Sequence, residues 1–287
     1  MLNQNIVSAQ TKILGIIGHP ISHSMSPVMH NIALSDLNLD YVYLAFDVLP
    51  KNLENALKGM RALNIKGINI TIPFKESVIP YLDIIDPLAQ KIGAVNTIKL
   101  QDDVIYGKNT DAAGFKKSLN EAQINPSGLD VLLLGSGGAA RAISYTLIDN
   151  INRLAIINRT KQNAEQLVSR LKKESNSPIV AKKLTNINLK NEINIADLLI
   201  NATPVGMYPS QHDSIINPKM LHRDLTVIDL VYNPLETQLI KDAKIAGCIT
   251  LNGLDMLINQ GSLAFEWWTN KKPNTSLMKG KIIELLS

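Results

Sequence analysis

A glycine-rich run between two short apolar segments is the feature that most constrains how this chain can fold. Residues 131–134 and 154–157 are both apolar, and the stretch between them begins with the run and continues with helix-forming residues. Because short apolar segments predict buried strands, this order predicts a β-strand, an α-helix and a second, parallel strand. The run itself consists of Gly135, Ser136, Gly137, Gly138, Ala139 and Ala140.

The spacing of the small residues in this run is typical of a dinucleotide-binding turn. Gly135 permits the tight turn, Gly137 lets the backbone approach a pyrophosphate, and Ala140 allows the helix to pack closely on the strand. Free N–H groups at the start of the helix would hold the anion. A turn that merely needs glycines is the alternative, and the strands predicted on both sides disfavour it. We therefore predict that residues 135–140 bind a dinucleotide.

The residues after the second strand indicate which dinucleotide is bound. Proteins that bind NAD usually end this strand with an acidic residue, whereas this chain has no carboxylate there before Glu165. A guanidinium matches the oxygens of a 2′-phosphate, so Arg159 favours NADP. A solvated helix start is the alternative, but two cations there would oppose the helix dipole without an anion. The predicted 2′-phosphate site is Asn158, Arg159, Thr160 and Lys161.

Apolar segments alternate with helix-period stretches along the rest of the chain, which predicts a mostly parallel α/β architecture. At 287 residues the chain is long enough for two domains. The C-terminal residues have a strongly helical pattern, and we expect them to complete the first domain. The predicted domains are an α/β substrate-binding domain, 1–110 plus 254–287, and a Rossmann-like NADP-binding domain, 111–253. The further predicted strands are residues 13–17, 41–46, 65–71, 198–200 and 227–231.

Composition and charge disfavour several other classes of protein. The chain is 45% hydrophobic and 19% charged, as globular proteins are, and its net charge is only +4. The lysines are scattered rather than interleaved with aromatic residues, so no nucleic-acid partner is expected. Cys248 is the single cysteine, which excludes an intrachain disulfide and suits a reducing compartment. We expect a soluble, cytoplasmic protein without a metal or a membrane span. Monomer and homodimer stay open, because a sheet edge of the first domain could pair with a second copy.

Polar residues gather where the predicted strands of the first domain end. They lie in residues 23–27, 69–75, 96–97 and 109–111. Open α/β sheets bind ligands at the carboxyl ends of their strands. Hydroxyls, amides, one lysine and one carboxylate suit a small polyhydroxylated acid, because each buried substrate hydroxyl needs a hydrogen-bond partner.

Each of these polar residues also has a structural interpretation. Ser26 is also interpretable as the cap of a helix that has Pro27 at its first position. Thr71 is equally interpretable as an ordinary strand residue. A turn residue is the less favoured alternative for Asn96. The histidines of the region, His23 and His30, are more often structural than functional.

Eight ordered blocks extend over nearly the whole chain, namely Gly18–Pro27, Asn69–Lys75, Gly93–Thr97, Asn109–Asp111, Gly135–Arg141, Asn158–Thr160, Asn201–Met207 and Tyr232–Pro234. Together they make the chain resemble the shikimate dehydrogenase family. This resemblance implies a reversible, NADPH-dependent reduction of 3-dehydroshikimate to shikimate, on the route to chorismate and the aromatic amino acids.

The resemblance also implies roles for individual residues. Lys75 and Asp111 would be the catalytic pair, with Lys75 donating a proton to the developing alkoxide while Asp111 keeps the ammonium oriented. Gly253 would join the cofactor site. The substrate-binding residues would be Ser24, Ser26 and Tyr232 for the carboxylate, and Thr71, Asn96 and Gln260 for the ring hydroxyls.

Three positions depart from the family pattern. Ala112 and Asp255 stand where glycine is common, and Asn163 stands where some relatives carry a second arginine. Two rival interpretations remain: a dehydrogenase that also uses quinate, often with NAD, and a silent NADP-binding protein. The lack of an acidic residue beside Arg159 argues against the first, and retention of the catalytic pair argues against the second.

Overall fold

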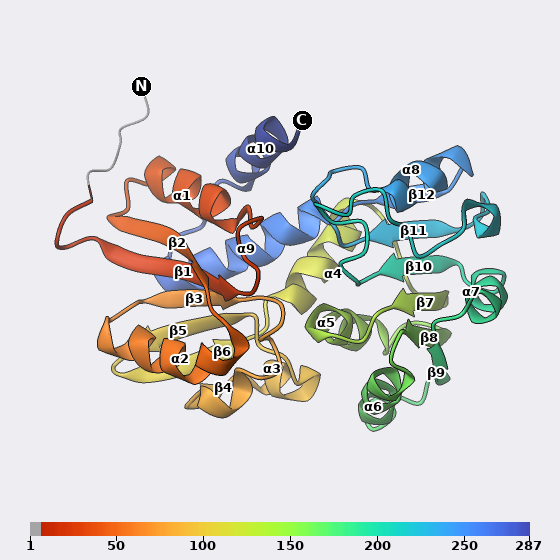
Figure 1. Ribbon diagram of the computed structural model, residues 1–287, viewed down its shortest axis with the longest axis horizontal. Helices are drawn as coiled ribbons and strands as arrows, with labels where there is room; N and C mark the ends of the chain where they lie inside the picture. The colour runs from red at the N-terminus through yellow and green to blue at the C-terminus, as the bar shows by residue number, and fades with distance from the viewer. Residues whose placement is uncertain (1–6) are drawn as a thin grey trace. The chain divides into compact units, whose positions relative to one another are not determined.

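The computed structural model describes residues 7–287, which fold into two compact units. The first unit runs to Gly114 and also contains Ile258–Leu285, whereas the second unit is Phe115–Leu257. Each unit is built around one six-stranded sheet with helices on its faces (Figure 1). The predicted α/β class is therefore confirmed.

The sheet of the first unit has the strand order β2-β1-β3-β5-β6-β4. As predicted, β1 is parallel to its neighbours β2 and β3, but β5 is antiparallel to both β3 and β6. The elements are β1 (Lys12–Gly18), α1 (Ser26–Asp36), β2 (Tyr41–Asp47), α2 (Leu53–Ala62), β3 (Gly67–Ile70), β4 (Ile84–Ile85), α3 (Pro87–Ile92), β5 (Thr97–Gln101) and β6 (Val104–Lys108), with short 3₁₀ turns at Pro50–Asn52 and Ile79–Tyr81.

The sequence pattern does not predict the β5–β6 hairpin. Its turn residues, Asp102 and Asp103, both have positive φ, 53° and 60°. A two-residue hairpin turn needs this conformation, and its usual sequence signal is Asn-Gly or Asp-Gly. Two consecutive aspartates adopt the same turn without giving that signal.

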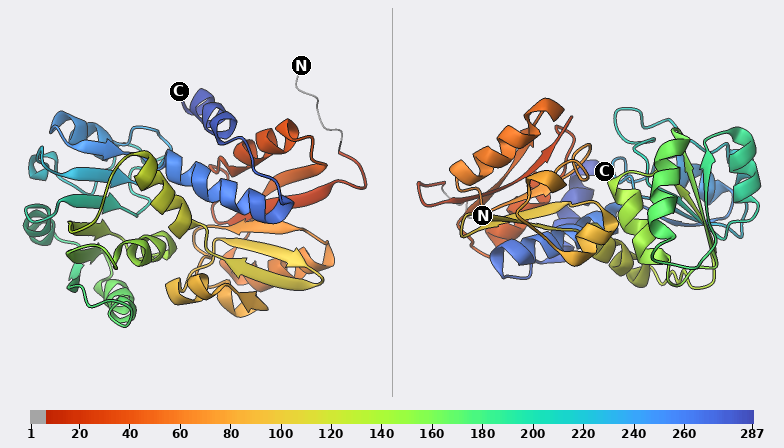
Figure 2. Two further views of the ribbon diagram at one scale, coloured as in Figure 1. Left: turned by 180° about the vertical axis from the view of Figure 1, so that it is seen from behind. Right: turned by 90° about the horizontal axis from the view of Figure 1, so that it is seen from below.

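Helices cover both faces of the first sheet. α2 and α3 pack on one face, where Leu57 and Ala89 belong to the same apolar cluster as Ile68 of β3. α9 (Leu254–Thr269) lies along the opposite face, as the view from behind shows (Figure 2). α10 (Thr275–Leu286) then ends the chain. The C-terminal segment Ile258–Leu285 is thus part of the first unit.

Trp268 of α9 attaches this helix to the sheet. Its indole Nε1 donates a hydrogen bond to the carbonyl oxygen of Ile98 at 2.9 Å. The indole ring lies over Gly67 of β3, and a Cβ atom at Gly67 would be only 2.2 Å from Nε1. The absence of a side chain at this position allows the close contact.

The start of α1 differs from the sequence prediction. Ser26 is the first residue of the helix rather than its cap, because Met25 already has helical backbone angles and occupies the N-cap position. No side chain caps this helix. The Ser24 hydroxyl oxygen instead accepts a hydrogen bond from the backbone N–H of Ser26, 3.3 Å away.

The outer edge of β2 is partly closed by α1. Asn31 donates to the carbonyl oxygen of Tyr43 and accepts from its N–H group, each at 2.9 Å. Unpaired groups on an edge strand are the ones that a further strand would bind. Asn31 therefore blocks the middle of β2 against pairing with a second copy.

The sheet of the second unit is parallel throughout its described strands, with the order β12-β11-β10-β7-β8-β9. This is the unit in which the sequence predicts a βαβ arrangement. Its elements are the later part of α4 (Asp111–Glu121), β7 (Asp130–Leu134), α5 (Gly138–Leu147), β8 (Arg153–Asn158), α6 (Lys161–Leu171), β9 (Ile179–Lys183), α7 (Asn186–Ile193), β10 (Leu198–Asn201), a 3₁₀ turn (Pro218–Met220), β11 (Thr226–Asp229), α8 (Gln238–Ile245), β12 (Ile249–Leu251) and the start of α9.

Alternate residues of this sheet face two separate apolar clusters. Val131 and Leu133 of β7 pack with residues of α5 and α6, whereas Leu132 and Leu134 pack with residues of α7 and α8. A parallel sheet buried on both faces needs such continuous apolar strands, which explains why their segments were recognisable in the sequence.

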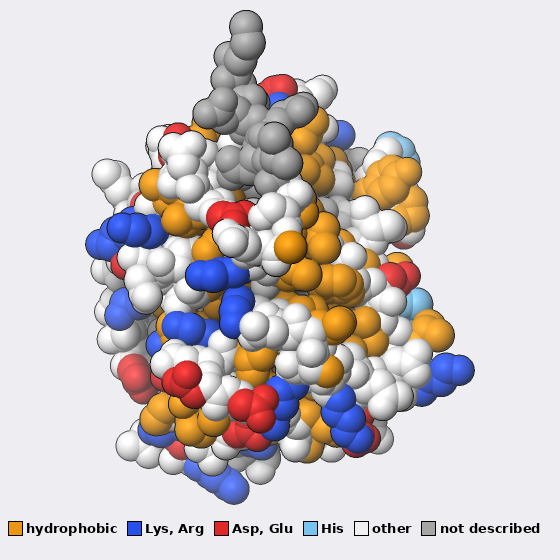
Figure 3. Space-filling model, turned by 90° about the vertical axis from the view of Figure 1, so that its left-hand side faces the viewer, with side chains coloured by type: hydrophobic (Ala, Val, Ile, Leu, Met, Phe, Trp, Pro, Cys, Tyr) orange, Lys and Arg blue, Asp and Glu red, His pale blue; other side chains and the backbone are white. Residues whose placement is uncertain are grey.

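The surface carries a mixture of side-chain types. On the face shown in Figure 3, basic side chains lie among acidic, hydrophobic and uncharged ones. Within residues 7–287, no helix combines the length and the apolar character that crossing a bilayer requires.

We expect Gly67→Ala to destabilise the protein, because the new methyl group would overlap the Trp268 indole. Overpacking of this kind costs about 1–3 kcal/mol. The measurement is urea unfolding, with Gly59→Ala as control. Gly59 lies inside α2 with nothing within 4 Å of its Cβ position, so alanine there should stabilise the helix slightly. Equal stability of Gly67→Ala and the wild type would contradict the packing argument.

Candidate active site

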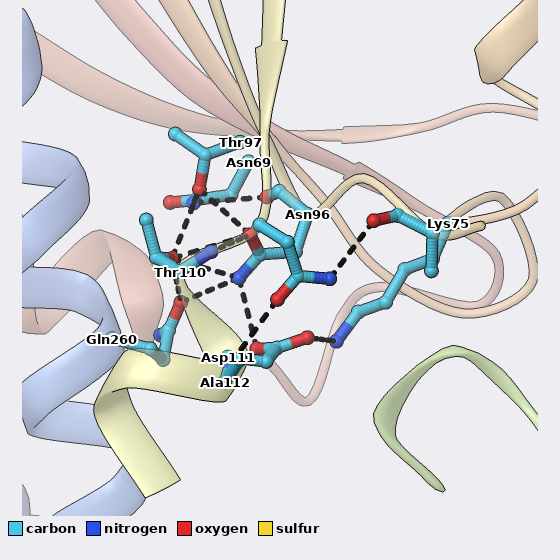
Figure 4. Close-up of polar contacts among 10 residues, drawn as sticks. Asn69, Lys75, Asn96, Thr97, Thr110, Asp111, Ala112 and Gln260 are labelled. Atoms are coloured by element: carbon cyan, nitrogen blue, oxygen red, sulfur yellow. Dashed lines mark hydrogen bonds and ion pairs between the residues drawn. The ribbon is translucent and has the colours of Figure 1, made fainter. Parts of the chain in front are cut away.

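Lys75 and Asp111 form a buried ion pair in the first unit. Lys75 lies in the loop after β3, and Asp111 is the first residue of α4. Lys75 Nζ donates to Asp111 Oδ2 at 2.6 Å (Figure 4), and the two side chains are only 15% and 5% exposed. A carboxylate at a helix start is also stabilised by the helix dipole. Within residues 7–287, no three His, Cys, Asp or Glu side chains are grouped as a metal site requires.

The buried side chain of Asn96 connects this pair to the rest of the site (Figure 4). Its Oδ1 accepts the backbone N–H of Thr110 at 2.7 Å. Because a backbone N–H can only donate, the atom that it contacts must be the carbonyl oxygen of the Asn96 amide and not its nitrogen. Asn96 Nδ2 therefore faces acceptors, namely Asp111 Oδ1 at 2.8 Å and Gln260 Oε1 at 3.2 Å.

A second layer of buried polar side chains supports Asn96. Thr97 Oγ1 donates to Asn96 Oδ1 at 3.1 Å and accepts from Asn69 Nδ2 at 3.1 Å. Asn69 Oδ1 in turn accepts from the Tyr43 hydroxyl at 2.7 Å. A fully bonded polar network favours one arrangement over others. The sequence blocks contain Asn69 and Thr97, but nothing in the sequence indicates that Tyr43 of β2 joins them.

Two glycines allow Gln260 to reach this network. Gly114 of α4 faces α9, and a Cβ atom there would lie 2.7 Å from the backbone nitrogen of Gln260. Gly261 packs against Met29 of α1, where a Cβ atom would be 2.3 Å from the methionine methyl group. Glycines inside predicted helices are the sequence signal for such close helix packing. The sequence analysis did not identify Gly114 as one of these positions.

The other predicted substrate-binding residues of the first unit lie at two neighbouring strand ends. Thr71 follows β3, while Ser24 and Ser26 follow β1, and these strands pair in parallel. The ends approach closely, since a Cβ atom at Gly18 would lie 2.6 Å from Thr71 Cγ2. Among residues 7–287, no hydrogen bond joins these three side chains to the Lys75–Asp111 pair.

In the second unit, the glycine-rich run forms the turn between β7 and α5. Gly135 has a φ of 105° and lies against the Ala202 carbonyl oxygen, so a side chain there would be strained. At Gly137, by contrast, nothing lies within 4 Å of the Cβ position. No side chain caps α5 and no acidic residue lies in its first turn. An open, uncapped helix start fits a pyrophosphate.

The predicted phosphate-binding residues lie at the carboxyl end of β8. Asn158 Nδ2 donates to the Thr160 carbonyl oxygen at 2.8 Å, which shapes the turn before α6. Arg159 is exposed, and Lys161 forms an exposed ion pair with Glu165 at 2.8 Å. The site therefore presents positive charge, although one of its two predicted cations already has a carboxylate partner.

Strand register adds Lys183, a cation that the sequence motif does not include. Lys183 is the last residue of β9 and aligns with Asn158 of β8. The preceding Lys182 contacts Glu192 on the α7 side at 2.5 Å, whereas Ala181 packs on the α6 side. Because side chains alternate along a strand, Lys183 lies on the α6 side, where the Arg159 turn begins.

Tyr232 and Gly253 both belong to the second unit. Tyr232 follows β11 and is half-buried. Gly253 precedes α9, and a Cβ atom there would lie 2.0 Å from the Leu230 carbonyl oxygen. The structure thus places Gly253 directly against the end of β11.

Three family profiles match consecutive parts of the chain. The shikimate dehydrogenase substrate binding domain matches residues 16–98, shikimate / quinate 5-dehydrogenase matches 118–233, and the shikimate 5′-dehydrogenase C-terminal domain matches 253–282. The shikimate dehydrogenase (NADP⁺) of Methanocaldococcus jannaschii is 44% identical over 283 residues, covering 98% of this chain and 100% of that protein. The chain belongs to the shikimate dehydrogenase family.

Solved structures of the shikimate dehydrogenase family have the same fold. A shikimate dehydrogenase in complex with NADP⁺ is 43% identical, with a TM-score of 0.90 and coverage of 98% of both chains. The quinate dehydrogenase of Corynebacterium glutamicum, in complex with NAD, is 31% identical with a TM-score of 0.85, covering 96% of this chain and 99% of that chain. Family members with different substrates therefore share this architecture.

His30 of α1 is a fully buried histidine next to the polar network. Its ring stacks on Tyr43 with a centroid distance of 4.3 Å, and Phe265 and Trp268 lie beside it. Burial lowers the pKa of His30 from 6.5 to about 3. The ring is therefore neutral at physiological pH and serves as part of the packed core.

We expect His30→Phe to reduce the acid sensitivity of the fold. In the wild type, the unfolded chain binds a proton at this histidine below pH 6.5, whereas the folded chain does so only near pH 3. The stability contributed by this residue is therefore lost as the pH falls through that window, by at most about 1.4 kcal/mol per pH unit. Urea unfolding at several pH values measures the slope. Equal slopes for variant and wild type would refute the prediction.

Proposed function

We propose that the protein catalyses the reversible reduction of 3-dehydroshikimate to shikimate with NADPH, and that Lys75 and Asp111 carry the proton transfer. Its family and its curated relatives make it an NADP-dependent oxidoreductase of the shikimate pathway, which leads to chorismate and the aromatic amino acids. The observation that carries the residue assignment is the buried ion pair at 2.6 Å, set among amides and hydroxyls.

The chemistry of ketone reduction accounts for the pair. NADPH, when bound, supplies the hydride that adds to the carbonyl carbon of the substrate. Lys75 Nζ donates a proton to the carbonyl oxygen as negative charge grows there, and the product is the alcohol. Asp111 holds the ammonium group in place, and the neutral amine left after transfer regains a proton from water. In the reverse direction Lys75 accepts the hydroxyl proton.

The neighbouring side chains suit the polar substrate. Asn96 and Gln260 are proposed to bind ring hydroxyls together with Thr71, because amides and hydroxyls both donate and accept hydrogen bonds. Ser24 and Ser26 are proposed to bind the substrate carboxylate, with Tyr232 joining them. The first unit is accordingly proposed to be the substrate-binding domain.

The second unit is proposed to be the NADP-binding domain. Supporting observations are the open space at Gly137, the uncapped start of α5 and the lack of a carboxylate directly after β8. Arg159 and Lys183 are proposed to hold the 2′-phosphate, with Lys183 supplying charge that Asn163 lacks. The full proposed set is Gly135, Ser136, Gly137, Gly138, Ala139, Ala140, Asn158, Arg159, Thr160, Lys161, Lys183 and Gly253.

Two further expectations remain proposals. Cytoplasmic residence is expected from the single cysteine, Cys248, and from the metabolic role. A homodimer is not favoured through β2, whose outer edge is blocked at Tyr43 by Asn31. Analytical ultracentrifugation would determine the oligomeric state.

The direct test of the reaction is absorbance of reduced nicotinamide with purified protein, comparing shikimate with quinate and NADP with NAD. We expect the highest kcat/KM with shikimate and NADP. Preference for quinate and NAD would favour the relation to quinate dehydrogenases. Tight NADPH binding without turnover would instead indicate a silent binding protein.

We expect Lys75→Ala to lower kcat by about 10²–10⁴-fold, because a positioned proton donor contributes about that factor. KM for shikimate should stay within severalfold. Steady-state kinetics measure both constants, and Lys58→Ala, an exposed lysine of α2, is the matched control. Loss of activity that only follows loss of folded protein would remove Lys75 from the catalytic role.

We expect Arg159→Ala to weaken NADPH binding about tenfold or more while NADH binding changes little, since only NADPH carries the 2′-phosphate. Lys183→Ala should have a smaller effect of the same kind. Nucleotide fluorescence titrations give both dissociation constants. The control is Lys173→Ala, an exposed lysine just after α6. Equal losses for NADPH and NADH would show that these side chains do not contact the phosphate.

A further inference from the structure

Asp229 is a completely buried carboxylate that the proposed reaction does not use. It is the last residue of β11 in the second unit. Its Oδ1 accepts from Asn201 Nδ2 at 2.9 Å and from the backbone N–H of Val231 at 3.1 Å, and its Oδ2 accepts from the Thr237 hydroxyl at 2.6 Å. Each of these partners is uncharged.

The carboxylate holds the Asn201 amide in one orientation, together with the backbone N–H of Thr203 and the carbonyl oxygen of Val205. An ionised carboxylate can only accept hydrogen bonds, so the NH₂ group of Asn201 must face it. The Asn201 carbonyl oxygen is then turned towards Thr203, where it accepts from the backbone N–H at 3.1 Å and from the hydroxyl at 2.7 Å. A flipped amide would place its NH₂ group against the Thr203 N–H donor.

Thr203 in turn lies against the glycine-rich turn. Ala202 N donates to the Leu134 carbonyl oxygen at 2.9 Å, which aligns the two chain segments. A Cβ atom at Gly135 would be 3.1 Å from the Ala202 carbonyl oxygen and 3.2 Å from Thr203 Cγ2. The turn therefore depends on where residues 202–203 lie, and these depend on Asn201.

A second branch from Asp229 reaches the loop that contains Tyr232. The Val231 N–H bond fixes the chain as it leaves β11, and Thr237 caps α8 by accepting from Ile240 N at 3.3 Å. Asp229 thus holds both loops that follow β10 and β11, at the edge where the glycine turn lies.

We propose that Asp229 is a positioning residue for NADPH binding, which acts through Asn201 and Thr203 on the Gly135 turn. This inference rests on the proposed function of the second unit.

The ionisation of Asp229 agrees with a role other than stability. Burial raises its pKa from 3.8 to about 6, against the lowering effect of its three hydrogen-bond partners. No charged side chain contributes to this shift among the described groups. Because the folded pKa is the higher one, stability is lost as the pH rises from about 4 through 6. At neutral pH the charged form therefore costs stability.

The first experiment compares Asp229→Ala with Asp229→Asn. Alanine removes every acceptor, so we expect the Kd for NADPH to rise about tenfold. Asparagine can still accept from Asn201 and can donate to Thr237, so its Kd should stay within about threefold of the wild type. The control is Asp197→Ala, because Asp197 accepts the Asp130 N–H at the opposite end of the sheet, 2.8 Å away. It should leave the Kd for NADPH unchanged.

A double-mutant cycle tests whether Asp229 acts through Asn201. If it does, Asp229→Ala should weaken NADPH binding far less in an Asn201→Ala background than in the wild type. Both substitutions break the same hydrogen bond between Asp229 and Asn201, so the second one has little left to remove. Fully additive effects would overturn the proposal. Thermal melts of every variant verify that the titrated protein is folded.

The pH dependence of stability gives an independent readout that remains usable if Asp229→Ala does not fold. Asp229→Asn should melt higher than the wild type above pH 6, and the difference should shrink at lower pH. An Asp229→Asn protein that melts lower at pH 8 and loses NADPH binding in parallel would show a purely structural role. Failure of the wild type itself to bind NADPH would refute the proposed function instead, so the two failures are distinguishable.

Discussion

The hydrogen bond from the backbone N–H of Thr110 to Asn96 Oδ1 is the interaction on which the proposed active site depends. A side-chain amide has two ends of similar shape and opposite polarity, and rotation exchanges them at little steric cost. The backbone donor removes this freedom, so the NH₂ end of Asn96 must face Asp111. Asp111 Oδ1 therefore accepts a hydrogen bond from Asn96 Nδ2, while Asp111 Oδ2 accepts one from Lys75 Nζ. A reversed amide would set its carbonyl oxygen against that carboxylate, and the ion pair would lose its support.

The second unit also contains a side-chain amide that its hydrogen-bond partners hold in one orientation. Asn201 there has its NH₂ end fixed by Asp229, a group that can only accept when it is ionised. In both units a backbone N–H fixes the carbonyl end of the amide, that of Thr110 for Asn96 and that of Thr203 for Asn201. In both units a buried carboxylate accepts from the NH₂ end. The two carboxylates differ in their other partners, because Asp111 meets the Lys75 ammonium group whereas Asp229 meets only uncharged groups.

Close backbone approach is the other recurring constraint. The absence of a side chain leaves room for the Trp268 indole at Gly67, for the backbone of Gln260 at Gly114, and for the Ala202 carbonyl oxygen at Gly135. In each case a single methyl group would separate two elements that carry polar contacts. The first contact attaches α9 to the sheet, and the second brings Gln260 within 3.2 Å of Asn96. Packing of small residues thus supports the polar geometry.

The sequence by itself determined the parallel strands, the glycine turn and the family. These depend on apolar periodicity and on backbone conformations set by neighbouring residues, which a local pattern records. Local patterns were less reliable where tertiary context intervened: Ser26 is not the cap of α1, and the Asp102–Asp103 turn gave no hairpin signal. Only the tertiary structure joined Asn96 to Gln260, 164 residues away, aligned Lys183 with Asn158, and buried Asp229 against Asn201. Such contacts depend on strand register and helix packing, which arise from the burial of many side chains at once, so no short stretch of sequence encodes them.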